Sequence, residues 1–169
     1  MSQGARPLVG IVLGSESDLP LMTKGVELLK KFGVEVEVQL SSAHRAPEMT
    51  ARYAREAEGR GILVLIGAAG FANHLAGALA AHTSLPVIGV PLNTSPLQGL
   101  DSLLSTVQMP GGVPVATVSI GEASAINAAI LAVQILATGD PPLRQAIHQY
   151  KQEMAEKIAR RSEEIRNRP

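Results

Sequence analysis

The sequence predicts an α/β fold in which a parallel sheet is covered by helices on both faces. Short apolar segments typical of strands alternate five times with segments of helical periodicity. No tandem repeat or low-complexity linker interrupts them, and the length favours a single domain, residues 1–169, with a substantial core. The connections between such parallel strands are expected to be right-handed crossovers.

The first predicted elements are a buried strand and the helix that follows it. Residues 8–14 (LVGIVLG) form a continuous apolar run that ends in glycine, as in strands buried on both faces. Residues 17–33 then repeat apolar side chains at helical spacing. Ser17 or Asp18 can cap this helix, and Gly33 can end it.

The middle of the chain continues the alternation. Residues 34–40 (VEVEVQL) alternate strictly between apolar and polar side chains, which predicts a strand with one polar face. We further predict a helix at 46–61, a fully apolar strand at 62–67, a helix of small residues at 72–83 and a fourth strand at 86–91.

The last part of the core repeats strand and helix once more. Residues 97–108 predict a short helix with an apolar face, residues 114–120 a fifth strand, and residues 122–139 a strongly apolar helix. We therefore expect the α/β core to occupy residues 6–138.

The C-terminal segment, residues 140–168, predicts one long polar helix with a narrow apolar stripe. The stripe consists of Leu143, Ile147, Tyr150, Met154, Ile158 and Ile165. The helix would reach roughly 40 Å, which is more than a domain of this size can cover. It could lie over its own domain, but we expect its stripe to pack on a neighbouring subunit.

The composition restricts the classes of function. Fifteen basic and fifteen acidic residues cancel, so general attraction to nucleic acid or to an anionic membrane is not expected. The absence of cysteine excludes thiolate chemistry and fits a reducing compartment. The N-terminus lacks a full signal-peptide apolar region, and the longest apolar stretch, residues 61–72, is too short to span a bilayer. We expect a soluble cytoplasmic protein.

Three polar or glycine-rich loops follow predicted strands. They are residues 14–20 (GSESDLP), 41–47 (SSAHRAP) and 67–77 (GAAGFANHLAG). Ligands of an open parallel sheet bind outside the carboxyl ends of its strands, so we expect the three loops to converge on one edge of the sheet.

The first loop places Ser15, Ser17 and Asp18 at the start of a helix, where hydroxyls and backbone N–H groups suit a phosphate. It is neither a Walker A loop nor G-x-G-x-x-G, so neither ATP nor a dinucleotide is the natural ligand. The carboxylate of Asp18 suits a sugar hydroxyl better than a phosphate. Alternatively, Ser17 and Asp18 are only helix caps.

The second loop sets His44 beside Arg45. Arginine can bind a phosphate through two parallel hydrogen bonds, and histidine can give and take a proton near neutrality. A histidine near a strand end is often structural. An anion-binding group adjacent to a proton carrier, however, is typical of a binding or catalytic site, and from the residues alone the two interpretations are about equally well supported.

The third loop holds Gly67, Gly70 and His74, and its glycines allow a flat ligand to approach the backbone. His74 could also be a first-turn helix residue bonded to neighbouring backbone. The four histidines lack the spacing of a zinc site, so no metal is expected, and His82 and His148 are given no role.

The chain closely resembles the N5-carboxyaminoimidazole ribonucleotide mutase family of purine biosynthesis in four stretches that occur in order. They are GSESDLP, SSAHRAP, GLDSLLSTVQMPGGVPVATVSIG and NAAILAVQIL, and the resemblance runs from about residue 8 to residue 138. It implies a flavodoxin-like three-layer α/β/α sandwich with a five-stranded parallel sheet, assembled as a homo-octamer with active sites between subunits. It also implies an isomerase that moves a carboxylate from the exocyclic nitrogen of a phosphoribosyl aminoimidazole to ring carbon 4, with no metal or other cofactor.

Carried over by position, the resemblance gives roles to individual residues. His44 would be the proton carrier, and Asp18 would hold the ribose hydroxyls of the substrate. The phosphate would be bound by Ser15, Ser17, Ser42 and Arg45. The loop with Gly70, His74 and Leu75 would close over the imidazole and the carboxyl group.

The third loop departs from the family pattern. Members commonly show Gly-x-Gly-Gly-Ala-Ala-His-Leu-Pro-Gly, whereas this chain has GAAGFANHLAG, with Phe71 and Asn73 added and Ala76 in place of proline. A related branch carboxylates aminoimidazole ribonucleotide directly with carbon dioxide, but its usual loop is different, so we expect the mutase. Outside enzymes, the alternative is a module that only binds a flavin or nucleotide, which the low aromatic content disfavours.

Overall fold

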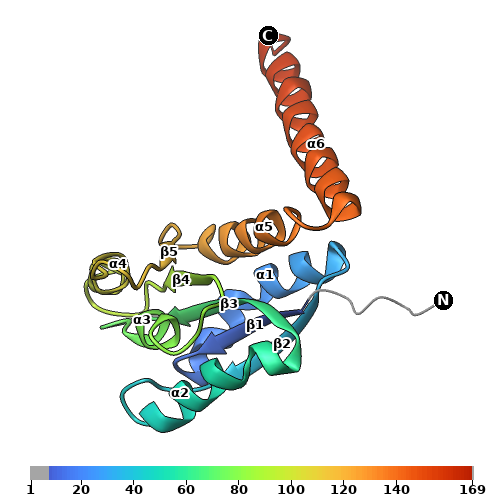
Figure 1. Ribbon diagram of the computed structural model, residues 1–169. Coiled ribbons are helices and arrows are strands. Elements are labelled where there is room, and N and C mark those ends of the chain that lie inside the picture. The colour runs from blue at the N-terminus through green and yellow to red at the C-terminus, as the bar shows by residue number, and fades with distance from the viewer. Residues whose placement is uncertain (1–7, 169) are drawn as a thin grey trace, which may run out of the picture.

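The computed structural model describes residues 8–168 and contains one parallel sheet (Figure 1). Its five strands lie in the order β2-β1-β3-β4-β5. The strands are β1 (Leu8–Leu13), β2 (Glu35–Leu40), β3 (Ile62–Ala69), β4 (Val87–Pro91) and β5 (Ala116–Thr117). Because β2 and β3 pair with opposite sides of β1, the strand order reverses between β1 and β3, and ligands of such sheets bind at the carboxyl ends of these strands. The core boundary expected at residue 6 lies outside the described residues.

Helices cover both faces of the sheet, which confirms the predicted flavodoxin-like three-layer sandwich (Figure 1). One layer contains α1 (Leu19–Lys31) and α5 (Ser124–Leu136). The other contains α2 (Pro47–Glu56) and α3 (Leu75–Ala80), and α4 (Leu100–Val107) packs beside β4 and β5. Two short 3₁₀ turns, Glu16–Asp18 and Glu58–Arg60, precede α1 and β3.

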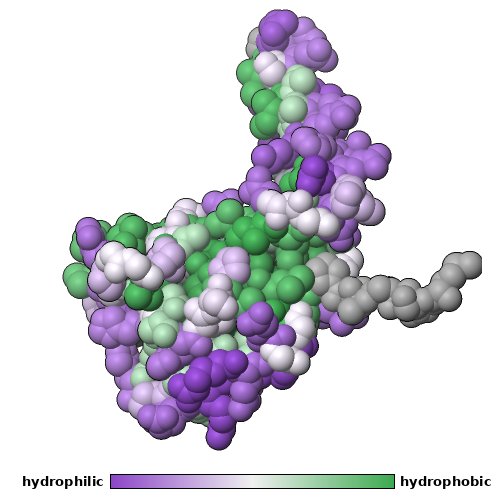
Figure 2. Space-filling model, viewed as in Figure 1, coloured by the Kyte–Doolittle hydropathy of each residue, from purple (hydrophilic) through white to green (hydrophobic). Residues whose placement is uncertain are grey.

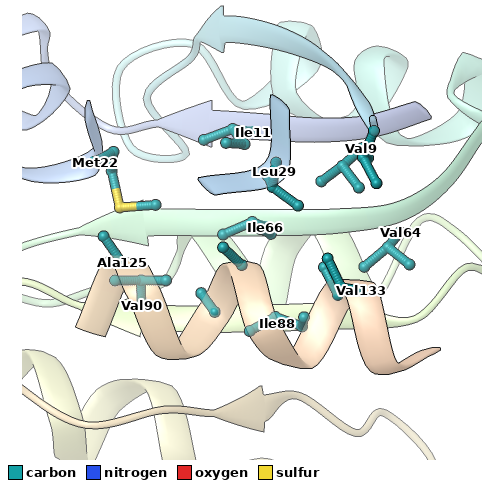
Figure 3. Packing of buried hydrophobic residues seen from close by; sticks show 14 of the residues in the cluster. Val9, Ile11, Met22, Leu29, Val64, Ile66, Ile88, Val90, Ala125 and Val133 are labelled. Carbon is teal, nitrogen blue, oxygen red and sulfur yellow. The ribbon is translucent and has the colours of Figure 1, made fainter. Parts of the chain in front are cut away.

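The core between the sheet and the layer of α1 and α5 is built from alternating strand residues (Figure 3). Val9 and Ile11 of β1 point to this layer and are fully buried, whereas Val12 faces the opposite layer. Burying one such side chain stabilises the fold by about 1.5–3 kcal/mol. Small residues let the two helices approach closely, since a Cβ on Gly25 would lie 2.6 Å from the carbonyl oxygen of Ala125.

Several predicted elements are shorter than expected, among them the helix predicted at residues 46–61, which spans Pro47–Glu56. The fifth strand is confined to Ala116–Thr117, because Pro114 has no N–H to donate to a ladder and Gly121, with φ of 89°, turns the chain towards α5. The helix predicted at residues 72–83 begins only at Leu75, since the preceding residues form part of a loop.

The alternation of β2 does not produce a buried apolar face. Val36 packs against the core, but Val38 and Leu40 are 43% and 48% exposed. The reason is the position of β2 at the edge of the sheet, where it pairs only with β1. The strand therefore exposes two apolar side chains that its sequence pattern predicts to be covered.

The C-terminal helix α6 (Pro141–Arg166) begins on the core and then leaves it (Figures 1 and 2). The Asp140 carboxylate caps its start by accepting a hydrogen bond from the Leu143 N–H group at 2.9 Å. Leu143 and Ile147 are buried, and Tyr150 packs edge-on against Phe32 at 5.6 Å between ring centroids. Farther along the predicted stripe, exposure is high: Met154 53%, Ile158 68% and Ile165 67%. Only the beginning of the helix thus covers its own domain.

None of the helices between Leu8 and Arg168 combines the length and the apolar character that crossing a membrane requires.

Candidate functional site

A pocket of about 520 Å³ lies at the carboxyl ends of the strands, between the loops that follow β1, β2, β3 and β4. The three loops singled out in the sequence therefore meet at one edge of the sheet, as predicted. The pocket is lined by Gly14, Ser15, Ser17, Asp18, Ser42, Ala43, His44, Arg45, Ala69, Gly70, Phe71, Ala72, Leu75 and Thr94. Every predicted site residue except His74 lies in this lining, and His74 contacts the pocket through His44.

The first loop turns the carboxylate of Asp18 inwards. Asp18 occupies the N-cap position of α1, but its side chain does not cap that helix and instead accepts a hydrogen bond from the Ser15 N–H group at 2.9 Å. Ser17 donates a hydrogen bond to the Ser15 hydroxyl at 2.9 Å and does not cap α1 either. Asp18 is only 3% exposed, and this burial raises the pKa of its carboxyl, partly opposed by the Ser15 N–H group. A buried, perturbed carboxyl in a pocket is typical of a functional site.

The variant Asp18→Asn should be more stable than the wild type at neutral pH. Because folding raises the pKa of Asp18 above its ordinary value of 3.8, the folded chain binds the proton more tightly than the unfolded chain. Wild-type stability therefore falls as the pH rises from 3.8 through the folded pKa, and a neutral amide avoids this loss. Urea unfolding at about pH 3.5 and about pH 7 measures the gain, which should be present only at the higher pH.

The matched control for this variant is Glu16→Gln, an exposed carboxyl in the same loop, which should change stability by less than about 0.5 kcal/mol. A gain for Asp18→Asn that is equal at both pH values would contradict the assignment of a buried, protonation-linked carboxyl.

The second loop is tied to its surroundings at both ends. The buried hydroxyls of Ser41 and Thr50 share a hydrogen bond of 2.7 Å, which joins the end of β2 to α2. Arg45 donates from Nε to the Ser42 hydroxyl at 3.3 Å and from Nη2 to the Gly14 carbonyl oxygen at 3.4 Å. A guanidinium has five N–H donors, so donors remain for an anion beside the first loop.

The two histidines of the site meet across the pocket edge. His44 Nε2 and His74 Nδ1 are 2.7 Å apart, and the ring planes cross at 77° with centroids 4.9 Å apart. The sequence left open a bond from the His74 side chain to neighbouring backbone; in the structure this side chain bonds the His44 ring instead. Both residues are exposed on this single chain.

The third loop is shaped by close contacts beneath it. A Cβ on Gly70 would collide with the Thr94 side chain, so only glycine lets this loop approach the loop after β4. Phe71 adopts a φ of 53° and is exposed, whereas Leu75 is buried beneath the pocket. Of the two residues added to the family pattern, Phe71 lines the pocket and Asn73 is completely buried.

Sequence reasoning missed the loop after β4, from which Thr94 lines the pocket. The sequence does contain a signal for this loop, because the polar residues Asn-Thr-Ser at 93–95 follow the apolar segment that forms β4. The carboxyl end of that strand belongs to the same sheet edge as the other three.

The pocket combines groups that suit a phosphorylated sugar bearing a reactive ring. Hydroxyls and a guanidinium lie near the first helix, one buried carboxyl can accept from sugar hydroxyls, and a pair of imidazoles can move a proton. Within residues 8–168, no three side chains of His, Asp or Glu gather closely enough to hold a metal ion.

Comparison with known proteins finds one matching family and several relatives of similar sequence. Residues 8–157 match the family described as AIR carboxylase. The N5-carboxyaminoimidazole ribonucleotide mutase of Synechocystis sp. is 51% identical over 94% of this chain and 89% of its own. The protein of the same name from Pseudomonas aeruginosa is 49% identical over 89% of this chain and 93% of its own. The one from Mycobacterium tuberculosis is 50% identical over 96% of this chain and 92% of its own.

Solved structures share the fold. A crystal structure of Treponema denticola PurE matches 96% of this chain and 100% of its own, with a TM-score of 0.84 at 29% sequence identity. The resemblance seen in the four sequence stretches is therefore confirmed over most of the chain.

Proposed function

Since the chain belongs to the AIR carboxylase family, we propose that it is a mutase of purine biosynthesis. The reaction converts N5-carboxyaminoimidazole ribonucleotide to 4-carboxy-5-aminoimidazole ribonucleotide. Relatives about half identical over most of both chains carry the mutase name, which supports this activity rather than direct carboxylation. The enzyme is accordingly an isomerase.

One observation of the structure carries the proposal. A single pocket brings His44 and Arg45 together with the buried carboxyl of Asp18, although these residues follow two different strands. The reaction needs a proton carrier near the imidazole ring and an anchor for the phosphoribosyl group. An imidazole and a guanidinium in one pocket support these two roles.

The phosphoribosyl group serves as the non-reacting handle of the substrate, and its binding energy holds the ring in position. Ser15, Ser17, Ser42 and Arg45 bind the phosphate, because their hydroxyl and N–H donors gather beside the first helix. Asp18, held by the Ser15 N–H group, accepts from the ribose hydroxyls.

The proton chemistry rests on His44. Protonated His44 gives its proton to the carbamate nitrogen, the N–C bond to the carboxyl group breaks, and carbon dioxide and the aminoimidazole ribonucleotide form. Ring carbon 4 then attacks the carbon dioxide, a C–C bond forms, and neutral His44 removes the proton from carbon 4. The cycle ends with His44 protonated again, so no co-reactant is consumed.

Retention of carbon dioxide makes the second step effectively intramolecular, which can lower the barrier by as much as about 7–11 kcal/mol. Gly70 and Leu75 line the pocket and would contact the ring and the carboxyl group, and the small side chains of Ala69 and Ala72 leave room for them.

The test of the function is a comparison of two substrates. The purified protein should convert the carbamate ribonucleotide without bicarbonate, and should use aminoimidazole ribonucleotide with bicarbonate much less efficiently. Product formation from aminoimidazole ribonucleotide with bicarbonate at an equal or higher kcat/KM would replace the mutase assignment by the direct carboxylase. A bound flavin in the purified protein would favour the binding module.

The single chain leaves the site open on one side, because His44, Arg45, Phe71 and His74 are exposed. A neighbouring subunit would exclude water from such a pocket, which supports sites between subunits, and family membership leads us to propose a homo-octamer as the assembly. Further surfaces suited to such contacts are the exposed Val38 and Leu40 on β2. The lack of cysteine and the purine-biosynthetic reaction support a cytoplasmic location.

The exposed part of the α6 stripe should hold this assembly together. Changing Met154, Ile158 and Ile165 to glutamine removes exposed apolar side chains while leaving the buried Leu143 and Ile147 in place. We expect the assembly to dissociate to smaller species, measured as mass in solution by light scattering.

The matched control for α6 changes Gln152 to alanine and Glu156 and Glu163 to glutamine on the opposite face of the same helix. This control should keep the wild-type mass. A stripe variant that also keeps the wild-type mass would show that α6 does not pack on a neighbour.

A further inference from the structure

The short contact between the site histidines restricts where their protons can lie. At 2.7 Å between His44 Nε2 and His74 Nδ1, one nitrogen must donate and the other must accept, because two N–H groups or two lone pairs would repel. The tautomer of one neutral ring therefore determines that of the other. In the described part of the chain, the His44 ring makes no other hydrogen bond.

The backbone under His74 is fixed by the residue before it. Asn73 is completely buried; its side-chain Nδ2–H donates to the Val90 carbonyl oxygen at 3.2 Å, and its backbone N–H donates to the Ser105 hydroxyl at 2.8 Å. These bonds tie the third loop to β4 and α4. Within residues 8–168 the Asn73 Oδ1 atom has no hydrogen-bond partner. Leaving a buried acceptor unpaired lowers the free energy of unfolding by about 1–3 kcal/mol.

The proposed reaction selects one of the two tautomer arrangements. His44 must act as an acid in the first step and as a base in the second. If His44 Nε2–H donates to His74 Nδ1, this hydrogen bond persists in both protonation states, and His44 Nδ1 is free to give and take the proton. If instead His74 Nδ1–H donated to His44 Nε2, neutral His44 would carry its proton on Nδ1 and could not act there as a base.

We propose that His74 is a positioning residue for His44, held in place by the buried amide of Asn73. Its Nδ1 accepts from His44 Nε2–H throughout the reaction, so His44 Nδ1 is the nitrogen that exchanges a proton with the substrate. The interaction becomes charge-assisted when His44 is protonated, which strengthens the orientation of the ring in the acid step. This inference rests on the proposed mutase activity.

The test compares His74→Leu with His74→Asn, two side chains of similar size. Asparagine carries its Oδ1 on Cγ, as histidine carries Nδ1, so it can still accept from His44, whereas leucine cannot. We expect His74→Leu to lower kcat by up to about 100-fold with little change in KM, since a misplaced reacting group can cost a factor of that size, and His74→Asn to recover most of the loss. The control His82→Leu, remote from the pocket lining, should keep the wild-type kcat.

A spectroscopic readout separates this inference from the activity itself. In the wild-type protein, ¹⁵N NMR of labelled histidine, with His44 assigned by loss of its signals in His44→Asn, should show neutral His44 with a bare Nδ1 and a protonated Nε2. In His74→Leu, neutral His44 should be a mixture of the two tautomers.

A wild-type His44 protonated on Nδ1, or a His74→Leu variant with full kcat, would overturn the positioning role while leaving the mutase activity intact. A wild-type protein that fails to convert the carbamate would overturn the function, and the NMR result would still decide the tautomer.

Discussion

His44→Asn should abolish turnover while keeping the substrate bound. Removing the proton carrier eliminates both the acid step and the base step, and general acid–base catalysis typically contributes a factor of about 10²–10⁴. The asparagine side chain is uncharged and fills much of the same space, and the anchoring groups on Ser15, Ser42 and Arg45 are unchanged. Steady-state kinetics with the carbamate ribonucleotide measures kcat, and calorimetry measures the affinity of the variant.

The matched control is His82→Asn, the same chemical change at an exposed histidine outside the pocket lining. This control should show wild-type kinetics. Appreciable turnover by His44→Asn at the pH of the assay would eliminate His44 as the proton carrier. Loss of substrate binding in that variant would instead show that the ring serves mainly to bind.

Arg45→Ala should chiefly weaken binding of the phosphorylated substrate. A hydrogen bond to a charged group contributes about 1.5–3 kcal/mol, so we expect the affinity to fall roughly 10- to 100-fold. The same change removes the bridge from Arg45 to the Gly14 carbonyl oxygen and the Ser42 hydroxyl, which loosens the contact between the first two loops. Calorimetric titration with the substrate and with its dephosphorylated nucleoside separates the two effects.

The nucleoside should bind equally weakly to the wild type and to Arg45→Ala, because it lacks the phosphate that the guanidinium grips. If the nucleoside lost as much affinity as the nucleotide, the phosphate role of Arg45 would be wrong. The control Arg52→Ala removes an exposed guanidinium from α2, outside the pocket lining, and should bind both ligands normally.

Local pattern was sufficient to predict the elements and the edge of the sheet that holds the site. The apolar runs at residues 8–14 and 62–67 became β1 and β3, since short apolar runs bounded by glycine are typical of strands in a parallel sheet, although Leu63 of β3 is exposed. Alternation of strand and helix required parallel strands, and parallel strands bring their carboxyl-end loops to one side. The order of the elements is therefore enough to place Ser15, His44 and Gly70 around one pocket.

Side-chain partners across the fold could not be read from the sequence. The contact of His44 with His74 joins residues thirty positions apart, and it depends on how far each loop extends from its strand. The burial of Asn73 beneath the third loop and the approach of Thr94 to Gly70 depend in the same way on the packing of β3 against β4. Such distances depend on how all the strands and helices pack together, so no periodic pattern in the sequence predicts them.

The sequence by itself determined the layered α/β fold, the order of its elements and the residues offered at the carboxyl edge of the sheet, because periodicity and turn chemistry are local properties. Only the tertiary structure decided which of these residues touch, that the apolar side of β2 remains exposed, and that α6 leaves its own domain after Tyr150. These features depend on strand order and on the direction in which a helix departs, which are set by contacts between distant segments.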